Sequence, residues 1–199
     1  MKKPEFWFSV GSTYGYLTVA RLPKIEAAEG ISFDWRPFNV REIMIEMDNV
    51  PFAKKPVKAT YMWRDIERRS VMYGLHPTLP APYPIQEFDL ANRIAVLARE
   101  QGWCREYVTE TYRQWFEHGK AAGGADNLET TLGKLGHNLN TVIAEAGSDG
   151  IAEAYRDATQ EARNRGIFGA PSFVVDGELF WGDDRLEDAL SWHKTGRVA

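Results

Sequence analysis

The segment that most constrains the fold of this chain runs from Gly166 to Leu186, GIFGAPSFVVDGELFWGDDRL. Pro171 has no backbone N–H, so it belongs at the first residue of a strand or just before one. The apolar run Ser172–Val175 follows it, and Asp176-Gly177 separates this run from a second one, Glu178–Trp181. Asp-Gly between two β-rich runs is a strong signal for a hairpin. The segment therefore predicts a proline, two antiparallel strands and then a helix.

The N-terminal end predicts a strand, a turn and a helix in close succession. Glu5–Val10 is rich in aromatic residues and leads into the turn-forming segment Gly11–Gly15. Tyr16–Glu29 then has apolar residues at helical spacing, and Ile31–Arg36 predicts a second strand. In such a βαβ unit the start of the helix offers unpaired N–H groups and a partial positive charge. We therefore expect the chemistry of the protein at this turn, which contains Ser12.

Length and composition indicate one enzyme-sized unit without a nucleic-acid or membrane partner. At roughly 150 residues per domain, 199 residues correspond to one or one and a half domains. The 24 basic residues do not exceed the 28 acidic ones, so nothing favours binding to nucleic acid. No apolar run approaches the roughly 18 residues of a membrane helix, and the N-terminus does not resemble a signal peptide. We therefore expect a cytoplasmic protein.

Cys104 is the only cysteine, and a single thiol cannot form an internal disulfide. This fits a reducing compartment and excludes a dithiol redox cycle within one chain. Cys104 lies between two helical patterns and far in sequence from Ser12, so we interpret it as a buried structural residue rather than a nucleophile. The histidines are isolated and do not have the spacing of metal ligands, so we expect no metal site. Nothing in the sequence supports a catalytic triad that includes Ser12.

Helical patterns dominate the middle of the chain, from about Val40 to Arg165. Only His76–Pro84, which contains four prolines, is expected to be extended. We predict that residues 39–165 form an all-helical insertion. The flanking segments, 1–38 and 166–199, then form a single α/β unit.

The chain resembles two related families, the 2-hydroxychromene-2-carboxylate isomerases and the kappa-class glutathione transferases. Its C-terminal segment is similar to the isomerase pattern FG-small-P-x-F-V-x-D-G-E-x-F-W-G-x-D-R-L, and the segment that begins at Lys58 is similar to K-x-x-Y-M-x-x-D-L. Ser12–Gly15 stands where these families carry a motif like Ser-Pro-Tyr-Ser, with Thr13 replacing the proline and Gly15 replacing the second serine. The resemblance implies an α/β, thioredoxin-like fold of the disulfide-oxidase type with a large all-helical insertion.

The resemblance also implies that Ser12 contacts the sulfur of glutathione. The pKa of that thiol lies above neutral, and each unit by which a site lowers it corresponds to about 1.4 kcal/mol of preference for the anion. A hydroxyl hydrogen bond, backbone N–H groups and the helix dipole provide such stabilisation. Ser12 is therefore predicted to donate a hydrogen bond to sulfur rather than to act as a nucleophile. The turn also predicts Ser12 or Thr13 as the N-cap of the helix, and the alternative for Ser12 is that it is only an N-cap.

Further contacts with glutathione are implied at Asn49, Lys58, Ala170, Pro171, Asp183 and Asp184. Ala170 precedes a proline that the resemblance implies to be cis, and its backbone can pair with the cysteinyl backbone of glutathione. Asp184 matches an acidic residue that pairs with the γ-glutamyl ammonium, and Asp183 lies beside it. The alternative for both aspartates is N-capping of the last helix. Lys58 can pair with the glycyl carboxylate or can be a solvated surface lysine.

We predict a glutathione-dependent isomerase that converts 2-hydroxychromene-2-carboxylate to trans-o-hydroxybenzylidenepyruvate, or a similar small aromatic substrate to its isomer. The resemblance implies that the thiolate adds reversibly to an unsaturated carbon, that the resulting single bond rotates, and that the thiolate then leaves. A kappa-like glutathione transferase is the close alternative. A non-catalytic binding module with a thioredoxin fold is the alternative from another class. The resembled enzymes are dimers, so we expect a homodimer.

Overall fold

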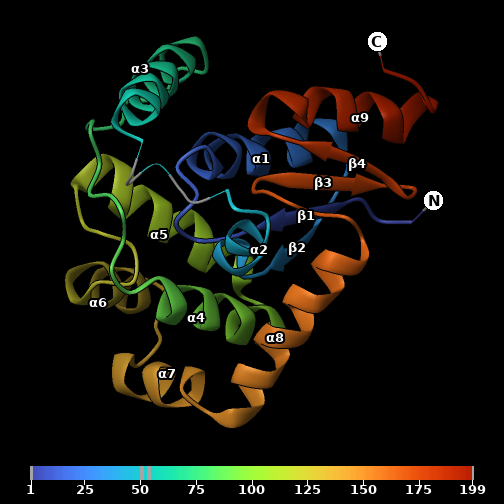
Figure 1. Cartoon of the computed structure of the whole chain (residues 1–199). Helices are drawn as coiled ribbons and strands as arrows, with labels where there is room; N and C mark the ends of the chain where they lie inside the picture. The colour runs from blue at the N-terminus through green and yellow to red at the C-terminus, as the bar shows by residue number, and fades with distance from the viewer. Residues whose placement is uncertain (1, 50–51, 53–54, 199) are drawn as a thin grey trace.

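The centre of the molecule is a four-stranded mixed β-sheet, in a computed structural model that describes residues 2–49, 52 and 55–198 (Figure 1). The strands are β1 (Glu5–Phe8), β2 (Asp34–Pro37), β3 (Ser172–Val175) and β4 (Glu178–Trp181). Their order across the sheet is β2-β1-β3-β4, so strands from the two ends of the chain pair at its centre. The hairpin predicted at Asp176-Gly177 is confirmed, because β3 and β4 are antiparallel neighbours.

The two central strands, β1 and β3, are almost entirely buried. β1 runs parallel to β2, from which α1 (Gly15–Glu29) separates it, and antiparallel to β3. Phe6 lies opposite Phe173 in this pairing, and the two rings stack with 5.6 Å between their centroids. Trp35 of β2 meets Phe6 edge-on at 4.9 Å. Large buried rings thus stabilise a sheet whose strands are only four residues long.

Helices cover both faces of the sheet and extend away from it. After α1 come α2 (Val40–Glu46), α3 (Pro56–Met72), α4 (Phe88–Gln101), α5 (Cys104–His118), α6 (Ala125–Lys134), α7 (Leu139–Ala146), α8 (Asp149–Asn164), the short 3-10 helix η2 (Asp183–Arg185) and α9 (Leu186–Thr195). In Figure 1, α9 lies above the strands while α4 and α8 lie below them, in agreement with the contacts of α9 to β3 and of α4 and α8 to β2. Because α2 to α8 are inserted between β2 and β3, the predicted thioredoxin-like α/β class with a helical insertion is confirmed.

One hydrophobic core runs through the sheet and the inserted helices. Tyr16 of α1, for example, stacks on Phe116 of α5 with 4.2 Å between the ring centroids. The domain division between residues 38 and 39 and between 165 and 166 stays a prediction. Cys104 is buried at the start of α5, and burial raises the pKa of its thiol, which confirms its interpretation as a structural residue.

The proline-rich segment that precedes α4 contains no helix, as predicted. Hydrogen bonds to the end of α5 hold it in place. The N–H of Thr78 donates to the Phe116 carbonyl at 2.7 Å, and the Trp115 indole N–H donates to the Pro82 carbonyl at 2.7 Å. The peptide bonds before Pro80 and Pro84 are cis. Over residues 2–49, 52 and 55–198, none of the helices combines the length and the apolar character that crossing a bilayer demands.

Candidate active site

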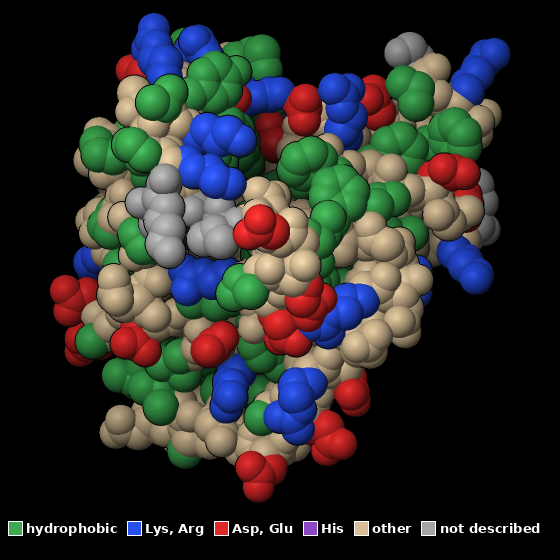
Figure 2. Space-filling view, viewed as in Figure 1, with side chains coloured by type: hydrophobic (Ala, Val, Ile, Leu, Met, Phe, Trp, Pro, Cys, Tyr) green, Lys and Arg blue, Asp and Glu red, His purple; other side chains and the backbone are tan. Residues whose placement is uncertain are grey.

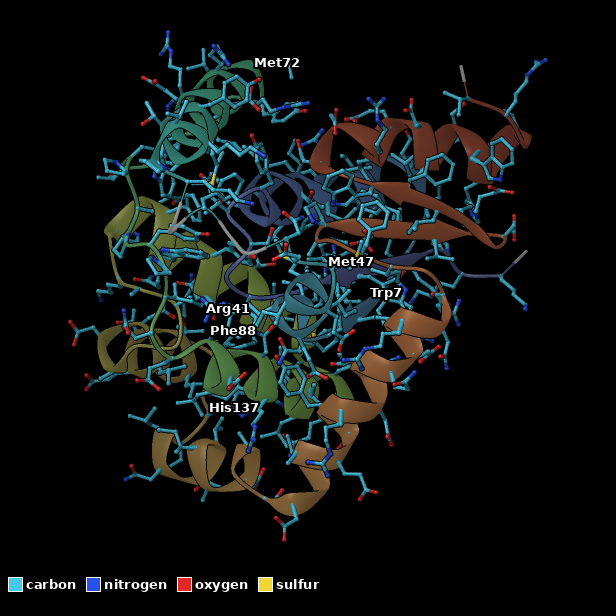
Figure 3. The ribbon with its side chains drawn as sticks, in the orientation of Figure 1. Trp7, Arg41, Met47, Met72, Phe88 and His137 are labelled. Atoms are coloured by element: carbon cyan, nitrogen blue, oxygen red, sulfur yellow. The ribbon has the colours of Figure 1, made fainter. Side chains whose placement is uncertain are left out.

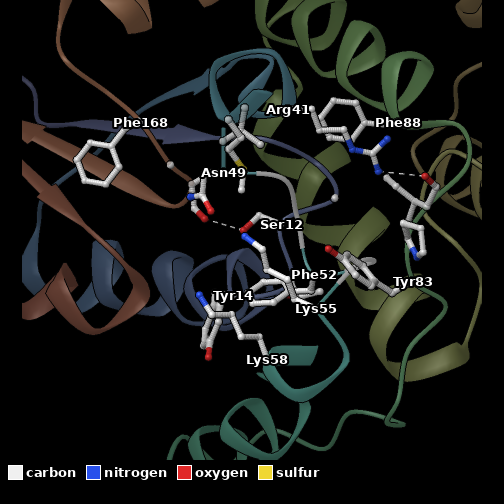
Figure 4. A pocket seen from close by; sticks show the side chains of 18 of the residues that line it. Ser12, Tyr14, Arg41, Asn49, Phe52, Lys55, Lys58, Tyr83, Phe88 and Phe168 are labelled. Carbon is white, nitrogen blue, oxygen red and sulfur yellow. Dashed lines mark hydrogen bonds between the residues drawn. The ribbon is translucent and has the colours of Figure 1, made fainter. Parts of the chain in front are cut away.

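A cavity of about 610 Å³ opens beside the loop that follows β1, between the sheet and the inserted helices (Figure 4). This volume is in the range of small-molecule binding sites. Apolar side chains form much of its wall, among them Met44, Phe52, Tyr83, Phe88, Phe168 and Trp181. The predicted site residues Ser12, Asn49, Lys58 and Ala170 line the cavity, whereas Pro171, Asp183 and Asp184 do not.

Ser12 lies in the turn between β1 and α1 and faces the bend at Ala170-Pro171. Its Oγ donates to the Ala170 carbonyl oxygen at 2.7 Å (Figure 4). The same oxygen accepts a longer hydrogen bond, 3.3 Å, from the N–H of Gly15. The Ala170-Pro171 peptide bond is cis, as the resemblance implied. The two segments expected to form the site therefore meet directly.

The prediction that Ser12 or Thr13 is the N-cap of α1 is wrong. The helix begins at Gly15, and its N-cap position is Tyr14, which makes no side-chain capping hydrogen bond. The physical reason is a further turn, closed by the Gly15 N–H on the Ser12 carbonyl at 3.1 Å, that precedes the helix. Thr13 is buried, and its hydroxyl lies 2.9 Å from the Sδ of Met62. Ser12 still satisfies one N–H of the first turn, through the Gly15 contact.

A buried tyrosine of α5 fixes the conformation of the serine-bearing loop. The hydroxyl of Tyr112 lies 3.2 Å from the Ser9 carbonyl and 3.0 Å from the Ser12 carbonyl, and burial raises its pKa so that it stays protonated. A Cβ on Gly15 would lie 2.6 Å from the Tyr112 hydroxyl oxygen. Tyr112 therefore leaves no room for a side chain at residue 15 in this chain.

Helix α3 holds the same loop from the other side. Tyr14 donates to Asp65 at 3.0 Å, and burial together with this carboxylate raises the pKa of the Tyr14 phenol. Met62, about one turn earlier on α3, accepts a hydrogen bond from the Thr13 hydroxyl through its sulfur. The segment that begins at Lys58, whose pattern supported the family resemblance, thus positions the turn that carries Ser12.

The described lining of the cavity includes three basic side chains, Arg41, Lys55 and Lys58, and no acidic one. In the view of Figure 4, Arg41 lies on one side of Ser12 and the two lysines lie on the other. Figure 2 shows basic side chains next to hydrophobic ones on the face between α3 and α2. Sequence analysis did not identify Arg41 as a site residue, because nothing in the local pattern distinguishes it from a solvated arginine of an amphipathic helix.

The two aspartates of the C-terminal segment have different surroundings. Asp183 is buried, and its Oδ1 accepts from Thr18 at 3.0 Å and from Arg21 at 2.9 Å. Burial raises its pKa, and Arg21 opposes this effect. Asp184 is half-exposed, and Arg69 lies 3.7 Å from one oxygen of each aspartate.

The N-capping alternative for these aspartates is wrong. The N-cap positions of η2 and α9 are Gly182 and Arg185, so neither aspartate occupies one. The carboxylate of Asp183 is turned toward α1 instead, where Arg21 binds it.

A mixed sheet with a helix after its first strand, and a serine turn that faces a cis-proline, defines a thioredoxin-like protein of the DsbA type. The sequence model of the DsbA-like thioredoxin domain matches residues 5–191. The chain belongs to this family.

Curated relatives cover nearly the whole chain. A 2-hydroxychromene-2-carboxylate isomerase of Sphingobium xenophagum is 29% identical over 188 residues, which are 94% of this chain and 95% of the relative. Glutathione S-transferase kappa 1 of Caenorhabditis elegans is 26% identical, with 92% of this chain and 86% of the relative covered. A solved structure of a 2-hydroxychromene-2-carboxylate isomerase aligns with a TM-score of 0.82 at 24% identity, over 93% of this chain and 91% of that one. The family resemblance and the expectation of an enzyme are confirmed.

Proposed function

We propose that this protein is a glutathione-dependent isomerase of an unsaturated, aromatic-derived substrate of the 2-hydroxychromene-2-carboxylate type. The observation that carries the proposal is the 2.7 Å hydrogen bond from Ser12 to Ala170, which places a hydroxyl donor beside the cis-proline bend and close to the start of α1. The only cysteine of the chain is buried in α5, away from this cavity. A sulfur anion held at Ser12 therefore belongs to a ligand.

Several of the residues present suit particular groups of glutathione. Ser12 and the N-terminal end of α1 suit a sulfur anion, and the Ala170 carbonyl suits a peptide N–H. Lys58 and Asn49 line the cavity, where the lysine suits a carboxylate. Asp183 and Asp184 lie outside the cavity lining, and Arg69 lies 3.7 Å from one oxygen of each. The Oδ2 atom of Asp183 accepts no hydrogen bond from the described residues, so the two carboxylates together suit the γ-glutamyl ammonium, which would share them with Arg69.

When bound, glutathione supplies a thiolate that adds to an unsaturated carbon of the substrate and leaves once the resulting single bond has rotated. Ser12 has one hydroxyl proton, so its donation to a sulfur anion releases the Ala170 carbonyl to accept from a peptide N–H. A charge-assisted hydrogen bond of about 1.5–3 kcal/mol lowers a thiol pKa by about one to two units. Burial raises the pKa of Tyr14 and of Tyr112, so these neighbours stay protonated and orient the loop instead of acting as bases.

A glutathione transferase is the second candidate, because a kappa-class transferase is among the relatives. The two reactions share the thiolate site and differ in whether the substrate expels the sulfur again. A non-catalytic binding module has less support, since the curated relatives that match along the chain are enzymes. The cytoplasmic location and the homodimer stay predictions.

The test is turnover of 2-hydroxychromene-2-carboxylate with and without glutathione, with products identified by NMR. Isomerisation that requires glutathione and does not consume it supports the proposal. A stoichiometric thioether product supports the transferase instead. Calorimetry that detects no binding of glutathione at millimolar concentration would contradict both and favour a binding module.

A further inference from the structure

We propose that Arg41 binds the carboxylate of the second substrate and thereby selects organic anions with an apolar frame. This inference rests on the proposed function, because it assigns a role within the same cavity. Arg41 is the second residue of α2, and its side chain reaches the cavity wall opposite the lysines (Figure 4). Figure 3 shows it beside Phe88, where α2 faces the start of α4.

Arg41 is held in place by contacts that leave its charge uncompensated. Its guanidinium lies 3.9 Å from the centroid of the Phe88 ring, and one N–H donates to the Ile85 carbonyl at 3.1 Å. It forms no ion pair with the described residues, and residues 50, 51, 53 and 54 carry no carboxylate. The charge of Asp89 favours the charged form of Arg41, but Asp89 lies beyond ion-pair distance from it. Arg21 and Arg36, whose side chains are only 10% and 21% exposed, each pair with two or more carboxylates.

An unpaired cation in a half-buried position is unfavourable unless an anion joins it. Burial lowers the pKa of Arg41, because a poorly solvated site disfavours the charged guanidinium. The arginine nevertheless stays charged at neutral pH. A guanidinium has five N–H donors arranged as a planar fork that matches a carboxylate. Only one of the donors of Arg41 has a hydrogen-bond partner among the described residues. The remaining donors are available to an anion in the cavity.

The position of Arg41 is coupled to that of Ser12 through one aromatic ring. Phe88 packs against Arg41 and also lies close to Gly11, where a Cβ would lie 2.8 Å from an atom of the ring. Gly11 has φ +119°, a conformation that favours glycine, and it directly precedes Ser12. Met44, Tyr83 and Phe168 extend the apolar wall. The cavity thus offers a cation at one side, an apolar surface and a hydroxyl donor, which suits an aromatic carboxylate more than a neutral compound.

The test compares trans-cinnamate with its neutral isostere cinnamamide in calorimetric titrations of the full-length protein, with and without glutathione. Wild type is expected to bind the acid at least about tenfold more tightly than the amide, because hydrogen bonds that involve a charged group are stronger than neutral ones. Arg41→Met, which keeps an apolar stem on Phe88, is expected to abolish this preference, and Arg41→Lys to retain part of it. Arg156→Met, at an exposed position of α8, is the matched control and should retain the full preference.

Each outcome decides one question. A preference for the acid that persists in Arg41→Met overturns the inference, and so does the absence of cinnamate binding to wild type. A merely structural role weakens acid and amide alike and leaves their ratio unchanged, which also overturns it. Loss of glutathione affinity in Arg41→Met, with cinnamate selectivity intact, assigns Arg41 to glutathione and overturns it. If glutathione fails to bind wild type while Arg41 still selects the acid, the inference stands and the proposed function fails.

Discussion

The hydroxyl of Ser12 donates a hydrogen bond of 2.7 Å to the carbonyl oxygen of Ala170, which lies 158 residues further along the chain. A sulfur anion at this site competes with Ala170 for the same proton. Ser12→Ala is therefore expected to raise the pKa of the bound glutathione thiol by about one to two units, the equivalent of one charge-assisted hydrogen bond. The pH dependence of the thiolate absorbance of the complex measures this pKa. Turnover is expected to fall far more than glutathione affinity, because only the anion loses a partner.

The control for this variant is Ser191→Ala, which removes a partly exposed serine hydroxyl in the middle of α9 that donates to the Arg197 carbonyl. That variant should leave the thiol pKa and the turnover at their wild-type values. Equal losses of turnover and affinity in Ser12→Ala would count against the role assigned to its hydroxyl.

Gly15 and Tyr112 are predicted to be energetically coupled. Gly15→Ala should lower the free energy of unfolding by about 1–3 kcal/mol, because its Cβ meets the Tyr112 oxygen at 2.6 Å within a fully buried environment. Tyr112→Phe removes that oxygen and should by itself lower stability by about 1 kcal/mol. The double variant should be more stable than the sum of the two changes predicts, as measured in a urea-denaturation double-mutant cycle.

Gly133→Ala on α6 is the matched control for this cycle, because nothing lies within 4 Å of a Cβ at that position. It should be neutral or slightly stabilising, since alanine has the higher helix propensity. Strict additivity of Gly15→Ala and Tyr112→Phe would show that the hydroxyl does not exclude a side chain at residue 15.

The hairpin at Asp176-Gly177 and the helical character of the middle segment were predictable because turn chemistry and apolar spacing are local properties of a sequence. The start of α1 was not, because it depends on a turn that Tyr112 stabilises from a position 100 residues away. In the sequence, the spacing of Tyr112 marks it only as a core residue of a helix. Nothing in the sequence around Tyr112 indicates that its hydroxyl binds the loop that carries Ser12.

Charged residues show the same limit of sequence-based prediction. Asp183 and Arg41 both stand near the start of a helix, where the sequence suggests a cap or a solvated side chain. The fold brings Arg21 and Thr18 to Asp183, whereas it brings an aromatic ring to Arg41 and, among the described residues, no carboxylate at ion-pair distance. Pairing of charges depends on which distant elements meet, so the candidate site could be located from the sequence but its electrostatics could not.

Asp184 is expected to contribute to glutathione binding through the γ-glutamyl ammonium. Because the side chain is half-exposed, its ion pair is worth up to about 1 kcal/mol, so Asp184→Asn should weaken glutathione binding about threefold to fivefold in calorimetry. Cysteinylglycine, which lacks the γ-glutamyl group, should bind the variant and wild type equally. Asp188→Asn, which removes the other carboxylate paired with Arg185, serves as the control. Unchanged glutathione affinity in Asp184→Asn would remove this residue from the site.

Glu110 is predicted to make the stability of the helical insertion dependent on acid pH. Its side chain on α5 is only 8% exposed and accepts hydrogen bonds from Arg113, from Gln114 at 2.7 Å and from Lys134 of α6 at 2.6 Å. Burial alone would raise the pKa of Glu110, but these donors outweigh it and lower the pKa from 4.5 to about 2. The folded protein therefore binds fewer protons at Glu110 than the unfolded chain does between these two pH values.

Because the folded pKa is the lower one, the contribution of Glu110 is fully present above about pH 5 and is lost as the pH falls toward about 2. We expect about 2 kcal/mol, since the exposed lysine and arginine partners are partly screened by solvent. Glu110→Gln should be less stable than wild type by this amount at neutral pH, and the two urea-denaturation curves should converge in acid. Glu106→Gln, an exposed carboxylate on the same helix, should leave the difference between neutral and acid stability as in wild type. A Glu110→Gln protein whose stability fell with acid as steeply as wild type would show that other carboxylates carry the acid sensitivity of α5 and α6.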